Sequence, residues 1–266
     1  MTTTADVSRR QDLAAFLRAR RNATRPEDVG LEREPGRHVP GLRREEVAAL
    51  AGISTTWYTW IEQGREITVS PEALVQIARA LNLTPRMVEY MSFLSRTTEP
   101  AVLDPSPVIP DAMRTLVQGH KESPAYVATA RFDLLVWNDF VGEMFDYKPT
   151  KDPFELNVVW RFFHDPTRRR LYLDWEKAAR MFVANFRHAF ARYRDDPHFE
   201  DLLERLMRSE DFARLWERWD VLAPDENSAF MVRDRRRGVC ELTPVHANLD
   251  TASGCYLAVF SCNQRS

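Results

Sequence analysis

The chain has 266 residues, which is enough for two domains that each bury a core of their own. A hydrophobic fraction of 44% and a charged fraction of 29% are ordinary for a globular protein. No apolar run approaches the ~20 residues that cross a bilayer, and MTTTADVSRR lacks the apolar segment of a signal peptide, so we expect a cytoplasmic protein. The net charge of −2 excludes strong nonspecific coating of nucleic acid, which needs a large positive excess.

The first predicted element is a helix from Ser8 to residue 22. Ser8 is a suitable N-cap, and Leu13, Phe16 and Leu17 form the apolar face. A polar loop with prolines follows at residues 23–41. Residues 1–98 contain 14 arginines, no lysine and 12 acidic residues, a net charge of +2, whereas the remainder has 23 basic and 27 acidic residues, a net charge of −4. This asymmetry is small, but it has the sign expected if the first part of the chain binds nucleic acid.

Residues 42–65, LRREEVAALAGISTTWYTWIEQGR, predict two short helices joined by a tight turn. Gly52 ends the first helix, and Ser54 is a strong N-cap for the second. Tyr58 and Ile61 are three residues apart and face inward. This spacing is typical of a helix-turn-helix unit that reads a DNA major groove, although a helical hairpin of the same spacing can also be plain scaffold.

The outer face of the second helix favours DNA binding. Threonine and glutamine can bond base edges, and arginines flank the unit where phosphates would lie. Either tryptophan ring can stack on the sugar-phosphate backbone or pack on a neighbouring helix. The predicted DNA contacts are Arg43, Arg44, Thr55, Thr56, Trp57, Thr59, Trp60, Gln63 and Arg65.

Two more helices complete this domain. Ser70 followed by Pro71 starts a helix that runs through Leu81, and Thr84 followed by Pro85 starts a fifth. The sequence therefore predicts an all-α five-helix helix-turn-helix domain at residues 1–98. Residues 99–110, EPAVLDPSPVIP, contain four prolines and predict a semi-rigid linker packed along a surface.

Beyond the linker the pattern changes to a mixture of strands and helices, which predicts an α+β domain with one antiparallel sheet at residues 111–266. Short apolar, partly β-branched runs indicate the strands. They are Tyr126–Thr129, Leu134–Trp137, Ala229–Val232, Val239–Val245 and Cys255–Ser261. Amphipathic, aromatic-rich helices lie between them: one includes Phe154 to Phe163, one starts at Trp175, and a third is capped by Ser209.

Several segments resemble one family. PGLRREEVAALAGISTTWYTWIEQGR at 40–65 is similar to the MmyB-like branch of the XRE class of lambda-repressor-like regulators, and so is the segment RPEDVGL. NVVWRFFHDPTRRRLYLDWEKAARMFVANFRHAFARY and FARLWERWDV resemble its C-terminal domain. The resemblance implies a PAS-like fold with a hydrophobic cavity for the second domain, and base-reading roles for Thr55, Thr56 and Thr59. It weakens after Val221, where this chain has RDRRRG in place of the family's histidine-proline segment.

With this resemblance, a pocket for a fatty-acid-like apolar ligand becomes the leading hypothesis for the second domain. An aromatic stripe at helical spacing is otherwise more often core than pocket. The predicted pocket wall is Trp137, Phe140, Trp160, Phe163, Phe182, Phe186 and Trp216. The candidate arginines for a ligand carboxylate are Arg161, Arg180 and Arg187, each of which can equally be a surface residue.

Enzyme and metal chemistry find little support. The sequence has no Gly-x-Ser-x-Gly, no His-Glu-x-x-His and no phosphate-binding glycine loop. His164-Asp165-Pro166 fits a helix end, and a metal or haem site at His164 or His188 stays open as a minor alternative. Cys240, Cys255 and Cys262 have no metal-ligand spacing and are interpreted as reduced packing residues. We expect no catalytic residues, no metal and no cofactor.

The sequence thus predicts a sequence-specific transcription regulator whose partners are a double-stranded DNA operator, a small apolar effector and a second copy of the chain. A homodimer is expected because a palindromic operator presents two half-sites about 34 Å apart. The alternative is a DNA-binding module fused to a dimerisation or protein-interaction domain that takes no small molecule.

Overall fold

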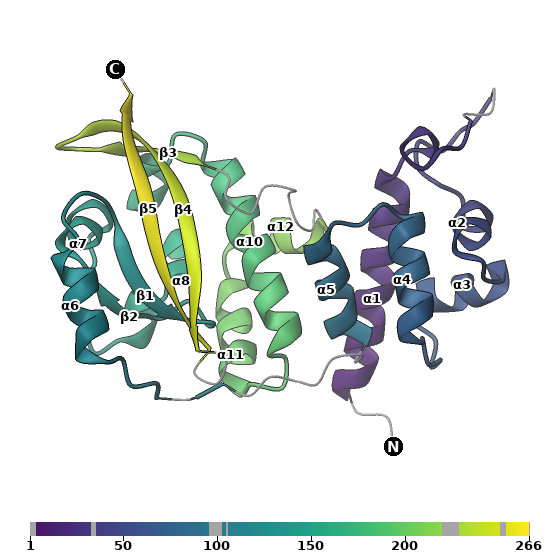
Figure 1. Ribbon diagram of the computed structural model, residues 1–266, viewed down its shortest axis with the longest axis horizontal. Helices are drawn as coiled ribbons and strands as arrows, with labels where there is room; N and C mark the ends of the chain where they lie inside the picture. Colours follow the sequence, from purple (N-terminus) through teal and green to yellow (C-terminus); the bar gives the residue numbers. More distant parts are fainter. Residues whose placement is uncertain are drawn as a thin grey trace. The chain divides into compact units, whose positions relative to one another are not determined.

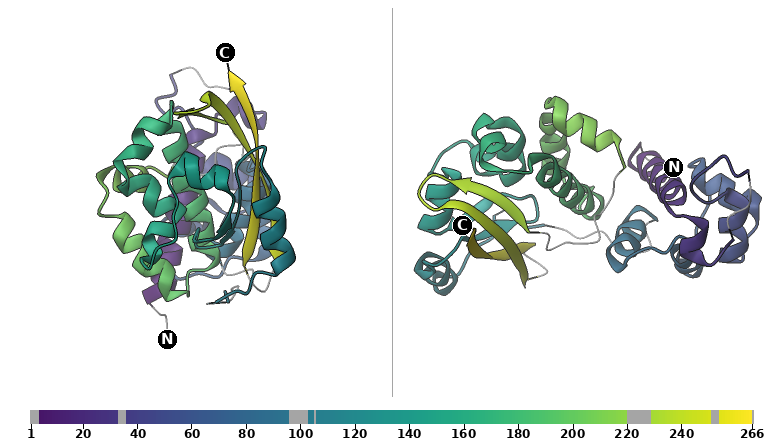
Figure 2. Two further views of the ribbon diagram at one scale, coloured as in Figure 1. Left: turned by 90° about the vertical axis from the view of Figure 1, so that its left-hand side faces the viewer. Right: turned by 90° about the horizontal axis from the view of Figure 1, so that it is seen from above.

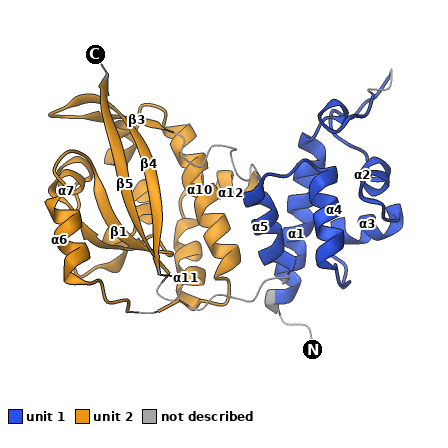
Figure 3. Ribbon diagram, in the orientation of Figure 1, with its two compact units in different colours: residues 1–101, 219–224 blue, residues 102–218, 225–266 orange. Residues whose placement is uncertain are grey.

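The computed structural model describes residues 4–32, 36–95, 103–104, 106–219, 229–250 and 254–265. The chain divides into two compact units (Figure 3). Unit 1 comprises residues 1–101 with 219–224, and unit 2 comprises residues 102–218 with 225–266. Across the described ranges, no helix is long and apolar enough to span a membrane.

Unit 1 is helical throughout its described part (Figure 1). Its elements are α1 (Thr4–Ala23), the 3-10 helix η1 (Pro26–Val29), α2 (Arg44–Ala51), α3 (Thr55–Glu62), α4 (Pro71–Ala80) and α5 (Pro85–Ser95). The predicted all-α domain with five helices is confirmed. The predicted start at Ser8 is wrong, because α1 begins at Thr4: Asp6 lies in its first turn, where the helix dipole favours an acidic side chain.

Serine hydroxyls begin α3 and α4, as the sequence predicts. The Ser54 hydroxyl accepts a hydrogen bond from Trp57 N (3.2 Å), and the Ser70 hydroxyl accepts one from Ala73 N (3.2 Å). The core of unit 1 is built from apolar faces of different helices, with Phe16 of α1 packed edge-on against Tyr90 of α5 at 5.3 Å between ring centroids. Capping sets where each helix starts, and burial of these faces then fixes how the helices pack.

Unit 2 contains one five-stranded sheet in the order β2-β1-β5-β4-β3, in which every neighbouring pair is antiparallel. The strands are β1 (Ala125–Thr129), β2 (Leu134–Trp137), β3 (Phe230–Asp234), β4 (Gly238–Asp250) and β5 (Cys255–Arg265). The α+β prediction is confirmed. Strands β4 and β5 run several residues beyond the predicted ends, and residues 251–253 between them lie outside the described residues.

Eight helices are described in unit 2. They are α6 (Asp111–Gly119), α7 (Asp139–Phe145), the 3-10 helix η2 (Pro153–Leu156), α8 (Val158–His164), α9 (Pro166–Leu171), α10 (Trp175–Arg192), α11 (Pro197–Leu206) and α12 (Glu210–Glu217). The helix predicted to include Phe154 and Phe163 is in fact two elements. Asn157 separates them, because its side-chain oxygen accepts a hydrogen bond from Trp160 N (2.9 Å) and starts α8.

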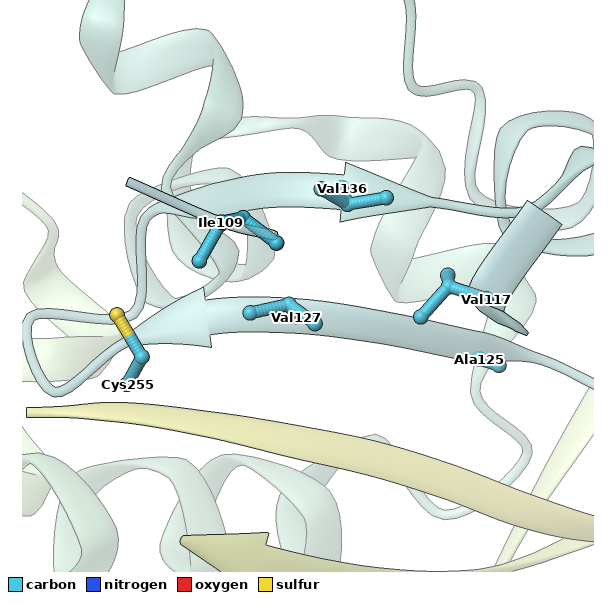
Figure 4. Close-up of a cluster of buried hydrophobic side chains, with 6 residues drawn as sticks. All are labelled: Ile109, Val117, Ala125, Val127, Val136 and Cys255. Carbon is cyan, nitrogen blue, oxygen red and sulfur yellow. The ribbon is translucent and has the colours of Figure 1, made fainter. Parts of the chain in front are cut away.

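The two faces of the sheet are covered differently (Figure 2). One face packs on α6 and on Ile109 before it, forming a cluster with Val127, Val136 and Cys255 (Figure 4). Ile109 belongs to the predicted linker, of which residues 99–102 and 105 lie outside the described residues. The other face lies against α8, α9 and α10. The face that lies against α8, α9 and α10 contains the cavity described below.

Candidate functional site

The α2–α3 pair has the geometry of a helix-turn-helix unit. Gly52 closes α2 with φ 67°, in the left-handed region that glycine adopts most easily. Tyr58 and Ile61 are buried, as predicted, and hold α3 against the rest of unit 1. Thr55, Thr56 and Gln63 are exposed. The turn and the two buried side chains therefore present a polar face of α3 to solvent.

The remaining predicted contacts of α3 are more constrained. The Thr59 hydroxyl donates to Thr55 O (2.8 Å), so toward a base it can act only as an acceptor, with its methyl group beside it. Trp57 is half-buried, whereas Trp60 is exposed and has the Arg65 guanidinium 5.6 Å from its ring centroid. Of the two tryptophans, Trp60 is the more exposed.

A buried carboxylate lies beneath this surface. Glu62 is 1% exposed, and its oxygens accept from Arg21 Nε (2.6 Å) and Arg44 Nε (2.7 Å). Burial opposes ionisation, yet the two arginines hold the pKa of Glu62 below its ordinary value of 4.5. Arg44, a predicted phosphate contact, is thus anchored at one nitrogen while its side chain remains 44% exposed.

Sequence reasoning missed Glu62. Its position beside Ile61, on the inward side of a helix whose buried positions were recognised, was the available signal. Arg43, also predicted to contact phosphate, is half-buried at the start of α2, where its backbone N donates to the Glu46 carboxylate (2.6 Å). Arg37 binds the same carboxylate. The side chains of Arg21, Arg37 and Arg44 are therefore positioned by acidic residues of the same unit.

Unit 2 contains a mostly apolar hollow of about 440 Å³, including the part that is open to solvent. The sheet contributes Tyr126, Leu134, Phe230 and Phe260. The helices contribute Val141, Phe145, Val158, Phe162 and Phe182, and the remaining lining residues are Tyr147, Arg168 and Tyr172. We call this hollow the sheet-side cavity.

Arg168 is the charged residue in that lining. It is 3% exposed, and its guanidinium donates to Phe145 O and lies 5.1 Å from the centroid of the Tyr147 ring. Its Nε is 3.7 Å from Asp165 Oδ2, a loose ion pair. Burial raises the pKa of Tyr147 and Tyr172, so both hydroxyls stay neutral. The cavity wall thus combines apolar rings with one cation, a combination that suits an amphiphile with an anionic head.

The three arginines predicted to bind a carboxylate have other positions. Arg161 is close to the cavity, with its guanidinium 5.1 Å from the Tyr147 ring centroid, and it pairs with Asp165 (2.7 Å). Arg180 lies 3.7 Å from Glu176 at the surface. Arg187 lies 4.2 Å from the Trp216 ring centroid and donates to Trp216 O. Arg168 was overlooked because the run TRRRL reads as a solvated helix face.

Of the seven predicted wall residues, Phe182 lines the sheet-side cavity. Phe186 belongs to a separate ring cluster, with centroids at 5.8 Å from both Phe212 and Trp216. The others are not part of the lining and have ring or cation neighbours of their own. Trp137 lies near Tyr147, Phe140 under Arg237, Trp160 on His164, and Phe163 against Phe212. The aromatic stripe of α10 is therefore divided between a cavity and a packed core.

No group of three or more potential metal ligands occurs among the described residues. His164, an open alternative for a metal or haem, stacks on Trp160 at 4.7 Å between centroids and has Nδ1 3.1 Å from Trp160 O. These contacts account for the orientation of its ring.

Two family models match the chain. The model of the MmyB-like transcription regulator ligand binding domain matches residues 109–266, which is more than half of the chain, and a helix-turn-helix domain model matches residues 12–91. A comparison with curated proteins finds no match. The first match contains the sheet-side cavity, and the second contains α2 and α3.

Proposed function

The chain belongs to the MmyB-like transcription regulators, with a DNA-binding helix-turn-helix domain and a ligand-binding domain, and we propose that its effector is an amphiphile with an apolar tail and a carboxylate, such as a fatty acid. The observation that carries this proposal is the buried Arg168 in an otherwise apolar cavity wall. A buried cation is costly unless anions and acceptors compensate it. Arg168 donates to Phe145 O and makes a loose ion pair with Asp165 at 3.7 Å, and a ligand carboxylate would add a further anionic partner.

The proposed DNA interface is the exposed face of α3 with its flanking arginines. Thr55, Thr56, Thr59 and Gln63 would contact base edges, while Arg43, Arg44 and Arg65 would contact phosphates. Trp57 and Trp60 would stack on the sugar-phosphate backbone or pack on a neighbouring helix. Support comes from the exposure of this face and from the buried Glu62 that fixes Arg44 at its edge.

The proposed mechanism is a population shift in a homodimer. A ligand that binds one arrangement of the second domain better than another changes the fraction of molecules whose two recognition helices are spaced for half-sites about 34 Å apart. The low positive charge of residues 1–98 supports this view, because specificity then depends on the placement of two helices more than on total charge.

The effector proposal is tested with a matched pair of ligands, a long-chain fatty acid and the alcohol of the same chain length. The purified protein is first extracted with organic solvent, and bound lipid is identified by mass spectrometry. In fluorescence titrations we expect the acid to bind about 10- to 100-fold tighter than the alcohol, the effect of a ~1.5–3 kcal/mol charge-assisted hydrogen bond. Arg168→Gln should remove this preference, whereas the exposed Arg180→Gln should keep it.

A lipid-free extract together with equal, weak binding of acid and alcohol would reject the effector proposal and favour a protein-interaction domain.

The proposed DNA interface is tested separately. Replacing Thr55, Thr56 and Thr59 by alanine together should abolish specific operator binding without changing the helical circular-dichroism signal. The exposed Gln76→Ala on α4 is the matched control and should bind normally. Normal operator binding by the triple variant would show that α3 does not read the groove.

A further inference from the structure

Strands β4 and β5 bring two thiols together on one face of the sheet. In the β4–β5 register Cys240 lies opposite Gln264 and Cys262 lies opposite Leu242, so the cysteines are diagonal neighbours. Side chains directly opposite each other in an antiparallel pair share a face, and this face is the one on which Phe260 lines the sheet-side cavity. The side chains of Cys240 and Cys262 are close enough for the Cys262 thiol to influence the ionisation of Cys240.

The third cysteine is on the other side of the sheet. Cys255 is seven residues before Cys262 on β5 and therefore points to the opposite face. There it packs with Val127 and Ile109 in the cluster beneath α6 (Figure 4). The sheet separates Cys255 from the other two sulfurs, so the only close thiol pair among the described cysteines is Cys240 with Cys262.

The two thiols differ in environment. Cys240 is buried, and burial followed by the neighbouring Cys262 thiol raises the pKa of Cys240 to about 11. Cys240 is therefore protonated and shielded at neutral pH. Cys262 is partly exposed, so an oxidant in solution reaches it first.

We propose that Cys262 and Cys240 form a reversible disulfide in response to a hydroperoxide. The Cys262 thiolate attacks the outer peroxide oxygen, which gives a sulfenic acid and releases the alcohol, or water when the oxidant is hydrogen peroxide. The Cys240 sulfur then attacks the sulfenic sulfur, loses its proton and displaces water. Overall two thiols and one hydroperoxide give one disulfide, one alcohol and one water.

Because Cys240 and Cys262 are diagonal neighbours, closing the disulfide requires a conformational change. Diagonal partners have Cα atoms about 7–8 Å apart, whereas disulfides need Cα atoms about 4.4–6.8 Å apart. The strands must therefore shift to close the bond, and a disulfide closed under strain is readily reduced again. Leu242 lies opposite Cys262 on one side and opposite Phe230 of the cavity wall on the other. Oxidation would thus move strands that form one wall of the sheet-side cavity.

The test uses the reduced full-length protein, a small molar excess of hydrogen peroxide, and alkylation of the remaining thiols before mass spectrometry. The sequence has no lysine or arginine between Gly238 and Arg265, so trypsin leaves all three cysteines in one peptide. Further cleavage after Glu241 and Phe260 separates them. We expect an intact mass loss of about 2 Da, a Cys240–Cys262 cross-link, an alkylated Cys255, and recovery of all three thiols with dithiothreitol.

Cys255→Ser is the matched variant and should form the same cross-link. Cys240→Ser should stop at sulfenic or sulfinic acid on Cys262. A cross-link that includes Cys255, a disulfide between two chains, or a sulfinic Cys262 beside an alkylated Cys240 in the wild-type protein would each overturn the proposal. Failure to react at peroxide levels that oxidise a free peptide thiol would do so as well. The wild-type and Cys255→Ser results decide the matter even if the other variant does not fold.

Discussion

The Glu62 network gives the most direct test of how the DNA-binding surface is supported. Glu62→Gln keeps the size of the side chain but removes the charge that Arg21 and Arg44 share. Breaking a fully buried ion pair costs about 3–5 kcal/mol. Arg44 is 44% exposed and can rehydrate, whereas Arg21 is only 12% exposed, so we expect a loss of about 2–3 kcal/mol.

Calorimetry of the full chain measures this loss. A unit of this size shifts its midpoint by about 4–8 °C per kcal/mol, so a loss of about 2–3 kcal/mol should lower the transition of unit 1 by roughly 8–24 °C. Hydrogen exchange of peptides from α2 and α3 should show the same loss locally. Glu45→Gln, an exposed acidic residue in the first turn of α2, is the control and should shift the midpoint far less.

The lowered pKa of Glu62 determines how its contribution to stability changes with pH. Because the folded pKa of Glu62 is below the ordinary 4.5, its contribution is fully present above pH 4.5 and is lost as the pH falls through the lowered folded pKa. The difference in stability between wild type and Glu62→Gln should be constant at neutral pH and shrink in acid. An equal midpoint for the two proteins at pH 7 would refute the claim that this carboxylate supports α3.

Three further predictions concern single positions. Gly52→Ala should lower the stability of unit 1 by about 1 kcal/mol in thermal unfolding, because Gly52 has a φ of 67°. An added Cβ meets no atom within 4 Å, so the loss comes from the backbone conformation alone. Gly52→Asn should cost less, because asparagine tolerates this conformation better. Phe186→Ala should cost about 3–5 kcal/mol in chemical denaturation, while Phe182→Ala, in the cavity wall, should cost less. Asp165→Asn keeps the cap of α9 but frees Arg168, so it should tighten fatty-acid binding by about 1 kcal/mol, roughly fivefold, in the same fluorescence titration.

Local signals in the sequence predicted most of the fold. The serine caps of α3 and α4 are readable because each acts on its own neighbours. The five strands were readable from short apolar runs bounded by turns. Helix α7 was missed although Asn138 before Asp139 is a cap signal, because the helix that follows is only seven residues long and has little periodicity.

The cavity could not be predicted in the same way. Its wall combines residues from the sheet and four helices, so membership depends on the tertiary packing and not on any local period. Phe182 and Phe186 lie one turn apart on α10 and have the same residue type, yet one lines the cavity and the other lies in the packed ring cluster. The resemblance predicted that a cavity exists, but residue type alone could not identify the residues that line it.

The partners of the buried polar groups could not be predicted from local sequence signals either, because they are distant in sequence. Arg21 donates to Glu62 and also to Leu42 O (2.9 Å), so a single guanidinium joins α1, the end of α3 and the segment before α2. Lysine carries the same charge but lacks the planar set of donors that reaches two acceptors at once. Residues 1–98 use 14 arginines and no lysine. Composition therefore did contain a structural signal that net charge conceals, because several arginines of this unit bind acidic and carbonyl groups within the unit.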